Sequence, residues 1–148
     1  MKGASRDGVQ IAFDVVGAGP PILLLHGFSH DRSIWARTGW VEHLQAEFTV
    51  VTPDLRGCGA SDKPEAPADY SIEAHIADVE AVLAELGIDR PIVWGWSFGA
   101  IPRARWSGLV SWPAVEPVVC AGGPYRSIDG ALRVDSFICA CSLFRGLP

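Results

Sequence analysis

Basic residues, histidines and long apolar runs are all scarce in this chain of 148 residues. The chain carries 12 Lys and Arg against 17 Asp and Glu, and the net charge of −5 leaves no basic patch for nucleic acid. No apolar run reaches the roughly 20 residues that span a bilayer, and the N-terminus lacks the apolar region of a signal peptide. We therefore expect one cytoplasmic domain with no nucleic-acid or membrane partner.

Cysteines and histidines are too few and too scattered to indicate a metal centre. The four cysteines lie at Cys58, Cys120, Cys139 and Cys141, match no zinc-binding or redox spacing, and are most simply explained by a reducing compartment. The four histidines form no HExxH motif and no cluster with the cysteines. We expect neither a metal ion nor a cofactor.

Apolar residues are abundant, at 49%, and they follow clear patterns in residues 1–100. The partly alternating stretch VQIAFDVVG (9–17) ends at Gly and Pro residues and predicts a strand. The continuous apolar runs PILLLHG (21–27), FTVVTPD (48–54) and PIVWGW (91–96) are typical of strands buried on both faces of a sheet.

A helix is predicted within residues 69–90, between the last two apolar runs. Its apolar positions recur every three or four residues, at Ile72, Ile76, Val79, Leu83 and Leu86. Ser71 is a candidate N-cap and Gly87 a candidate C-terminal stop. His75 falls off the apolar stripe, so we expect it to be solvated.

A second helical region is predicted for part of residues 31–47, with Trp35, Leu44 and Phe48 as candidate packing residues. Strands that alternate with helices indicate an α/β fold, in which a mostly parallel sheet has helices on both faces. Ligands bind such sheets beyond the carboxyl ends of the strands. The segments HGF, DLRGCG and GWSFG each follow a predicted strand, so we expect them to meet at one crevice.

The segment GWSFG places Ser97 between Gly95 and Gly99, in the pattern G-x-S-x-G. After a strand and before a helix, this pattern predicts a tight turn that presents the serine hydroxyl as a nucleophile. Backbone N–H groups of Phe98 and Phe28 are the candidate donors to a developing oxyanion. The alternative interpretation is a serine in an ordinary strand-to-helix turn.

The segments LLLHGF, DLRGCGASDKP and GWSFGA, in this order and spacing, resemble the α/β-hydrolase fold over about residues 8–100. The resemblance implies an eight-stranded, mostly parallel sheet and a Ser–His–acid triad, with Ser97 as nucleophile and Phe28 and Phe98 forming the oxyanion hole. Family dehalogenases and epoxide hydrolases carry Asp at the position of Ser97, which argues against both activities.

The resemblance also implies supporting roles for other residues near the serine. His26 and Gly27 shape the HG loop, and we expect His26 to orient that loop rather than to act as general base. Asp54 and Arg56 are expected to fix the DLRGCG loop by hydrogen bonds and charge pairing, and Cys58 to be a small buried thiol. Trp35, Trp94 and Trp96 are more typical of a core, although Phe28 and Trp35 are candidates to line an acyl pocket.

Residues 101–148 depart from the family pattern. They contain no Lys, and no histidine occurs after His75, whereas the family's acid and histidine both follow the nucleophile. Pro102 disfavours the helix expected after Ser97, and a further strand is expected within residues 117–123. We therefore divide the chain into an α/β-hydrolase part, 1–100, and an atypical segment, 101–148.

Two functional hypotheses follow from these residues. The first is an esterase-like serine hydrolase for a small-molecule ester or related carbonyl substrate, impaired because the downstream acid and histidine are absent from a truncated or damaged sequence. The second is a non-catalytic remnant or ligand-binding domain. Both hypotheses leave a sheet edge uncovered, and self-association through that edge is expected.

Overall fold

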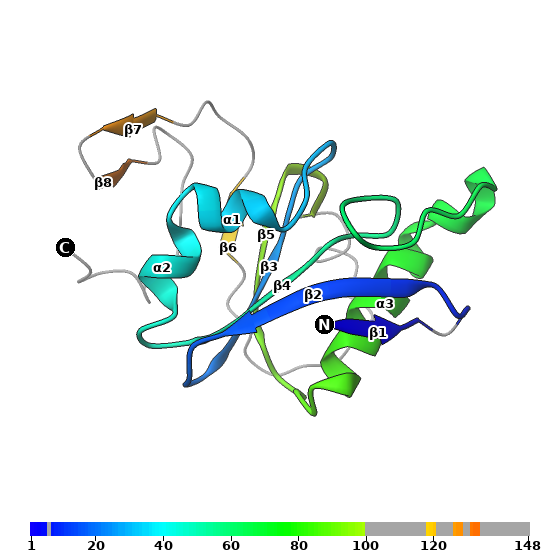
Figure 1. Ribbon diagram of the computed structural model, residues 1–148, viewed down its shortest axis with the longest axis horizontal. Helices are drawn as coiled ribbons and strands as arrows, with labels where there is room; N and C mark the ends of the chain where they lie inside the picture. Colours follow the sequence, from blue (N-terminus) through cyan, green and yellow to red (C-terminus); the bar gives the residue numbers. More distant parts are fainter. Residues whose placement is uncertain (6, 100–117, 121–125, 129–130, 134–148) are drawn as a thin grey trace.

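The computed structural model describes residues 1–5, 7–99, 118–120, 126–128 and 131–133, and its centre is a six-stranded sheet (Figure 1). The strand order is β1-β2-β4-β3-β5-β6, with parallel pairing of β4 with β3, β3 with β5, and β5 with β6. Strand β2 pairs antiparallel with both of its neighbours. The strands are β1 (Lys2–Ala4), β2 (Gln10–Val16), β3 (Pro21–Leu25), β4 (Thr49–Pro53), β5 (Ile92–Trp96) and β6 (Val118–Cys120).

The continuous apolar runs form the central strands β3, β4 and β5, as predicted. Successive side chains of a strand point to opposite faces, so a strand with helices on both faces needs apolar residues at every position. Leu23 and Leu25 of β3 pack into one core cluster, while Ile22 and Leu24 pack into the other. The sheet thus separates two layers of packed side chains.

Helix α3 (Ile72–Glu85) covers one face of the sheet, and helices α1 (Ser33–Arg37) and α2 (Trp40–Leu44) cover the other (Figure 1). The prediction that residues 31–47 are partly helical is confirmed. Trp35 and Leu44 are buried, and Phe48 packs against the same cluster. Two short 3₁₀ turns complete this part of the chain, η1 (Pro67–Tyr70) and η2 (Ser97–Gly99).

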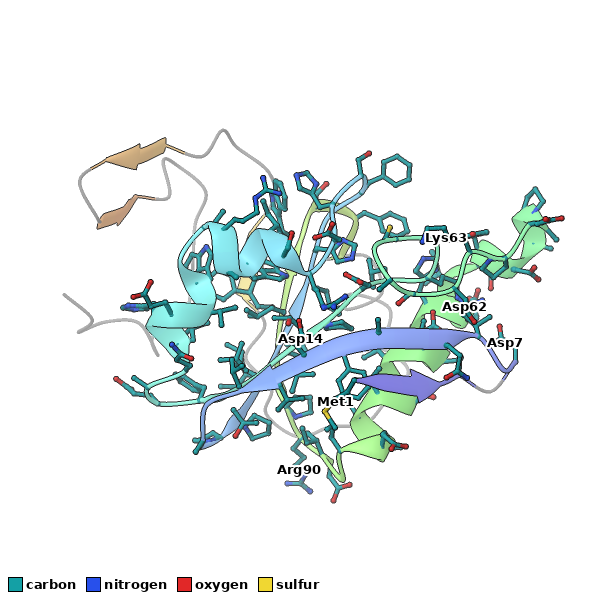
Figure 2. The ribbon with its side chains drawn as sticks, in the orientation of Figure 1. Met1, Asp7, Asp14, Asp62, Lys63 and Arg90 are labelled. Atoms are coloured by element: carbon teal, nitrogen blue, oxygen red, sulfur yellow. The ribbon has the colours of Figure 1, made fainter. Side chains whose placement is uncertain are left out.

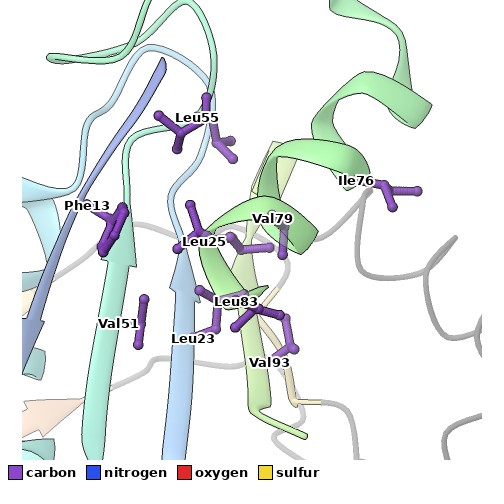
Figure 3. Packing of buried hydrophobic residues seen from close by; sticks show 11 residues of the cluster. Phe13, Leu23, Leu25, Val51, Leu55, Ile76, Val79, Leu83 and Val93 are labelled. Carbon is purple, nitrogen blue, oxygen red and sulfur yellow. The ribbon is translucent and has the colours of Figure 1, made fainter. Parts of the chain in front are cut away.

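Helix α3 begins and ends where the sequence predicts. The hydroxyl of Ser71 accepts a hydrogen bond from the backbone N–H of Ala74 at 3.2 Å, which caps the first turn. Gly87 follows the last turn with φ +64°, a left-handed conformation that glycine adopts without strain. The predicted apolar stripe is buried against the sheet, with Val79 and Leu83 at its centre (Figure 3).

The prediction that His75 is solvated is wrong, because only 3% of His75 is exposed. The apolar stripe marks the helix face that meets the sheet, but a second face of α3 meets the loop that follows β4 and the turn that follows β5. The His75 ring packs edge-on against Phe98, with ring centroids 5.2 Å apart. Asp78, on the next turn of the helix, is buried by Arg56 of that loop.

The sheet and its helices confirm the predicted fold class, an α/β fold with a mostly parallel sheet. Strand β6 lies within the range 117–123 in which a further strand is expected. Strands β7 (Arg126–Ile128) and β8 (Ala131–Arg133), which were not predicted, form a separate antiparallel pair. Self-association through a sheet edge stays a prediction. Pro102, which is predicted to disfavour a helix after Ser97, lies outside the described residues. None of the helices that are described has the length and apolar character to span a membrane.

Candidate active site

Three loops meet at the carboxyl ends of β3, β4 and β5, as predicted from their sequences. Together with the start of α3 and the turn before it, they enclose a cavity of about 330 Å³. Gly27 and Phe28 come from the loop after β3, residues 55–58 from the loop after β4, and Phe98 from the turn after β5; Tyr70 and His75 close the remaining side. The sheet topology therefore brings segments distant in sequence into one site.

Ser97 is the first residue of η2 and lies at the end of β5, beside this cavity. Its backbone has φ +53°, a left-handed conformation that is uncommon for any residue except glycine. Its side chain is exposed, while Gly95 and Gly99 on either side are buried. A strained turn thus holds the hydroxyl outward at the edge of the sheet where ligands bind.

Glycines allow the loop after β3 to pass directly beside this turn. A Cβ atom at Gly27 would lie 3.2 Å from the Cβ of Ser97, and a Cβ at Gly99 would lie 2.4 Å from the carbonyl oxygen of Leu25. The second distance is shorter than real Cβ contacts, so only glycine fits at position 99 without backbone movement. Gly95, within β5, pairs with Leu25 of β3.

Phe28 follows Gly27, and its backbone N–H donates to no acceptor among the described residues. Its side chain is 75% exposed and meets the ring of Phe98 edge-on, with ring centroids 6.2 Å apart. Phe28 and Phe98 therefore lie on the two segments that border Ser97. Their role as the two oxyanion donors stays a prediction.

His26 is fully buried, and both of its ring nitrogens are engaged. Nδ1 lies 2.9 Å from the carbonyl oxygen of Gly27 and must donate to it, while Nε2 accepts from the backbone N–H of Leu55 at 3.0 Å. Burial lowers the pKa of His26, which favours this neutral form. A ring held in this way joins the loops after β3 and β4 and has no free nitrogen to take a proton from Ser97.

Buried charges fix the loop after β4. Asp54 is fully buried, and its carboxylate accepts hydrogen bonds from the backbone N–H groups of Arg32 and Ala60 at 2.7 and 2.8 Å and pairs with the Arg32 guanidinium. A Cβ at Gly59 would collide with this carboxylate. Asp54 therefore fastens both its own loop and the start of α1.

Arg56 is buried between α3 and the turn that joins β1 to β2. Its Nε and Nη2 atoms donate to the two carboxylate oxygens of Asp78 at 2.7 and 2.6 Å, and Nη1 donates to Asp7, labelled at that turn in Figure 2, at 2.9 Å. The hydrogen bonds to Asp78 and Asp7 raise the pKa of Arg56 further above its ordinary value. Asp54 and Arg56 thus form the hydrogen bonds and charge pairs that the sequence predicts for this loop.

A family model described as the alpha/beta hydrolase fold matches residues 20–109, which include all three loops. The chain belongs to the α/β-hydrolase family. An uncharacterized protein of Mycobacterium tuberculosis is 41% identical over 132 residues, covering 87% of this chain and 37% of that protein. The chain thus spans little more than a third of the length of this curated relative.

Two solved α/β-hydrolase structures illustrate the range of similar proteins. An epoxide hydrolase of Vigna radiata has a TM-score of 0.68 and 27% identity, covering 74% of this chain and 35% of that chain. A thermophilic esterase of Thermogutta terrifontis has a TM-score of 0.66 and 31% identity, covering 74% of this chain and 40% of that chain. This α/β-hydrolase is therefore similar both to an ester-cleaving and to an epoxide-cleaving protein.

The remaining aromatic residues are divided between the cavity and the core. Phe28 lines the cavity as expected, and Trp35 lies in the core, as the sequence favours, so the alternative of a pocket position for Trp35 is wrong. Trp35 is 1% exposed and packs beside Trp94 in the cluster beneath α1 and α2. Trp94 is also buried, whereas Trp96 is only partly buried and meets His30 edge-on at 4.7 Å.

Sequence reasoning missed Tyr70 and His75 as cavity residues. Tyr70 ends the turn η1 and His75 lies in the first turn of α3, and no local pattern in the sequence places either residue beside the loops after β3 and β5. Cys58 is a free thiol in the cavity wall and is half-buried rather than buried as expected, because its side chain borders the cavity; burial still raises its pKa, which favours the uncharged form. Over the part of the chain that the structure describes, no three His, Cys, Asp or Glu residues gather into a metal site.

Proposed function

We propose that this α/β-hydrolase acts on carboxylic esters or related carbonyl substrates, with Ser97 as its nucleophile. The observation that carries the proposal is the exposed, left-handed serine at the end of β5, beside Gly27, at which an added Cβ would lie 3.2 Å from the Cβ of Ser97. The similarity to the Thermogutta terrifontis esterase supports ester chemistry. The presence of a serine at position 97, where family epoxide hydrolases are expected to carry Asp, argues against epoxide cleavage.

In the proposed reaction, Oγ of Ser97 attacks the carbonyl carbon while its proton passes to a base. The negative charge on the carbonyl oxygen is stabilised by the N–H groups of Phe28 and Phe98, each such donor contributing on the order of 3 kcal/mol to the barrier reduction. The carbon–oxygen bond to the leaving alcohol then breaks, and the alcohol takes up the proton. Water later cleaves the ester formed on Ser97 and releases the acid.

The 148-residue chain offers no clear candidate for the base that this reaction needs. No histidine follows His75 in the sequence, and both ring nitrogens of His26 are engaged. We propose that this chain by itself turns substrate over slowly, since oxyanion stabilisation without a base leaves only part of the rate enhancement. The same observation favours a second candidate function, a domain that binds a carbonyl ligand without cleaving it.

Covalent labelling with a fluorophosphonate probe tests the nucleophile. We expect the folded chain to be labelled, with mass spectrometry locating the adduct on Ser97. Ser97→Ala removes the labelling, whereas Ser33→Ala, a control at an exposed serine of α1, retains it. A folded chain that unfolds cooperatively in urea but takes up no probe would overturn the proposal and support the binding function.

A further inference from the structure

The cavity beside Ser97 has a composition suited to a small aromatic ligand. Three aromatic residues line it, Phe28, Tyr70 and Phe98, together with the apolar side chain of Leu55 and the half-buried thiol of Cys58. Its volume of about 330 Å³ falls at the lower end of the range for ligand pockets. Because an apolar cavity of about 150 Å³ suffices for benzene, this one has room for a single ring with a substituent.

One polar side chain in the cavity wall has an unused hydrogen-bonding atom. His75 is 97% buried, and its Nδ1 atom lies 2.9 Å from the carbonyl oxygen of Ser71, to which it must donate. In the neutral ring, Nε2 is then an acceptor. Among the described residues nothing donates to Nε2, and this atom is not among the buried side-chain atoms that lack a partner, so it is open to a group that enters the cavity.

Two other polar side chains of the cavity wall, those of Arg56 and Tyr70, are already paired. Arg56 directs its guanidinium at Asp7, Asp78 and two backbone carbonyls. The hydroxyl of Tyr70 donates to the carbonyl oxygen of Pro64 at 2.8 Å. Among the side chains of the cavity wall, the strongest hydrogen-bonding atom open to a ligand is therefore the acceptor on His75, and a matching ligand carries a donor.

We propose that this cavity holds a hydroxylated aromatic ring of the ester substrate, with the ring against Phe28, Tyr70 and Phe98 and the hydroxyl donating to Nε2 of His75. The inference rests on the proposed function, because it treats the bound ring as part of the molecule that Ser97 attacks. The cavity and the nucleophile are adjacent, because Gly27 and Phe98 line the cavity and also adjoin Ser97.

Binding of phenol to the full chain, followed by ligand-observed NMR, tests the inference directly. We expect phenol to bind about 2- to 10-fold more tightly than anisole, whose methyl group removes the donor but keeps the ring. Ser97→Ala retains this binding, because Ser97 does not line the cavity. Absence of phenol binding, or equal affinity for phenol and anisole, would overturn the inference without bearing on Ser97.

Two pairs of measurements locate the site. Cys58→Phe fills the cavity and abolishes phenol binding, whereas Cys58→Ser, which keeps the volume, retains it. His75→Phe reduces phenol affinity to that of anisole, while His43→Phe on the exposed surface of α2 leaves the preference for phenol intact. Phenol binding that survives Cys58→Phe would place the ligand elsewhere and overturn the inference.

Competition with the fluorophosphonate probe links the cavity to the reaction. Saturating phenol slows labelling of Ser97 severalfold in the unsubstituted chain but has no effect in Cys58→Phe. Labelling that phenol does not slow would overturn the assignment of the ring to the substrate. A failure of the proposed function itself is distinct, because no labelling occurs then in any variant, with or without phenol.

Discussion

Nε2 of His26 accepts a hydrogen bond from the backbone N–H of Leu55 at 3.0 Å, and this bond joins the loops that follow β3 and β4. The same ring donates from Nδ1 to the carbonyl oxygen of Gly27. A histidine that precedes the candidate oxyanion residue Phe28 therefore fixes the path of its loop. Protonation of Nε2 would remove the acceptor, so the loop depends on a neutral ring.

The stability of the chain is expected to decrease in mild acid because of His26. Burial lowers the pKa of His26 in the folded chain below the value of about 6.5 that it has in the unfolded chain. At a pH between the folded-state pKa and the unfolded-state pKa, the unfolded state therefore binds a proton that the folded state does not. The free energy of unfolding then falls as pH falls below about 6.5, by up to about 1.4 kcal/mol per pH unit. Urea unfolding at a series of pH values measures this slope.

His26→Gln is the variant that identifies the group responsible. It lowers the free energy of unfolding at neutral pH, because a buried hydrogen bond is lost, but it flattens the dependence on pH. His43→Gln, at an exposed position of α2, keeps the original slope. An unchanged slope in His26→Gln would show that another group controls acid stability.

Removal of Asp78 from the Arg56–Asp78 pair is expected to cost about 3 kcal/mol of stability, because Arg56 loses its buried counter-ion and keeps only Asp7, which is half-exposed, and two backbone carbonyls. Arg56 and Asp78 are each 2% exposed, and two hydrogen bonds of 2.7 and 2.6 Å join them. Asp78→Asn is the sharpest test, since it keeps the shape of the side chain. Asp89→Asn, at an exposed position, should change stability by less than about 0.5 kcal/mol. Similar losses in the two variants would contradict this account.

Gly99→Ala is expected to disrupt the turn that carries Ser97. The new Cβ would lie 2.4 Å from the carbonyl oxygen of Leu25 and 2.6 Å from that of His26, and neither backbone atom can move cheaply. We expect a loss of about 1–3 kcal/mol in stability together with a loss of fluorophosphonate labelling.

Gly39→Ala is the control, because no atom lies within 4 Å of its added Cβ. It costs about 1 kcal/mol for its positive φ and leaves labelling intact. Normal labelling of Gly99→Ala would contradict the importance of the close approach.

The cap of α3 gives a smaller expected effect. Ser71→Ala removes the acceptor for the backbone N–H of Ala74 and lowers the free energy of unfolding by about 1 kcal/mol. Ser71→Asp restores an acceptor and adds a favourable charge at the helix N-terminus, so it recovers the loss. Thermal unfolding followed by circular dichroism measures both variants. Equal stability of Ser71→Ala and the unsubstituted chain would show that the cap contributes nothing.

Apolar periodicity was sufficient to predict the central strands, the extent of α3 and the convergence of three loops. These features depend on short-range patterns, because a strand buried on both faces needs a continuous apolar run and a helix on a sheet needs one apolar stripe. Ser71 and Gly87 marked the ends of α3 for an equally local reason. The turn at Ser97 was predicted from its flanking glycines.

Only the tertiary structure decided what lies on the second face of α3 and around the cavity. His75 carries no pattern in the sequence that marks it as buried; it is buried because the rings of Phe98 and Tyr70 pack beside it. The sequence favours the core for Trp35 but leaves a pocket position open, and only the packing of α1 on the opposite side of the sheet decides for the core. The sequence alone therefore determined the central strands, the helix α3 and the turn at Ser97, since backbone geometry and apolar spacing are local properties, but it did not indicate the short strands β1, β7 and β8. Which side chains share a cavity depends on contacts between segments distant in the chain.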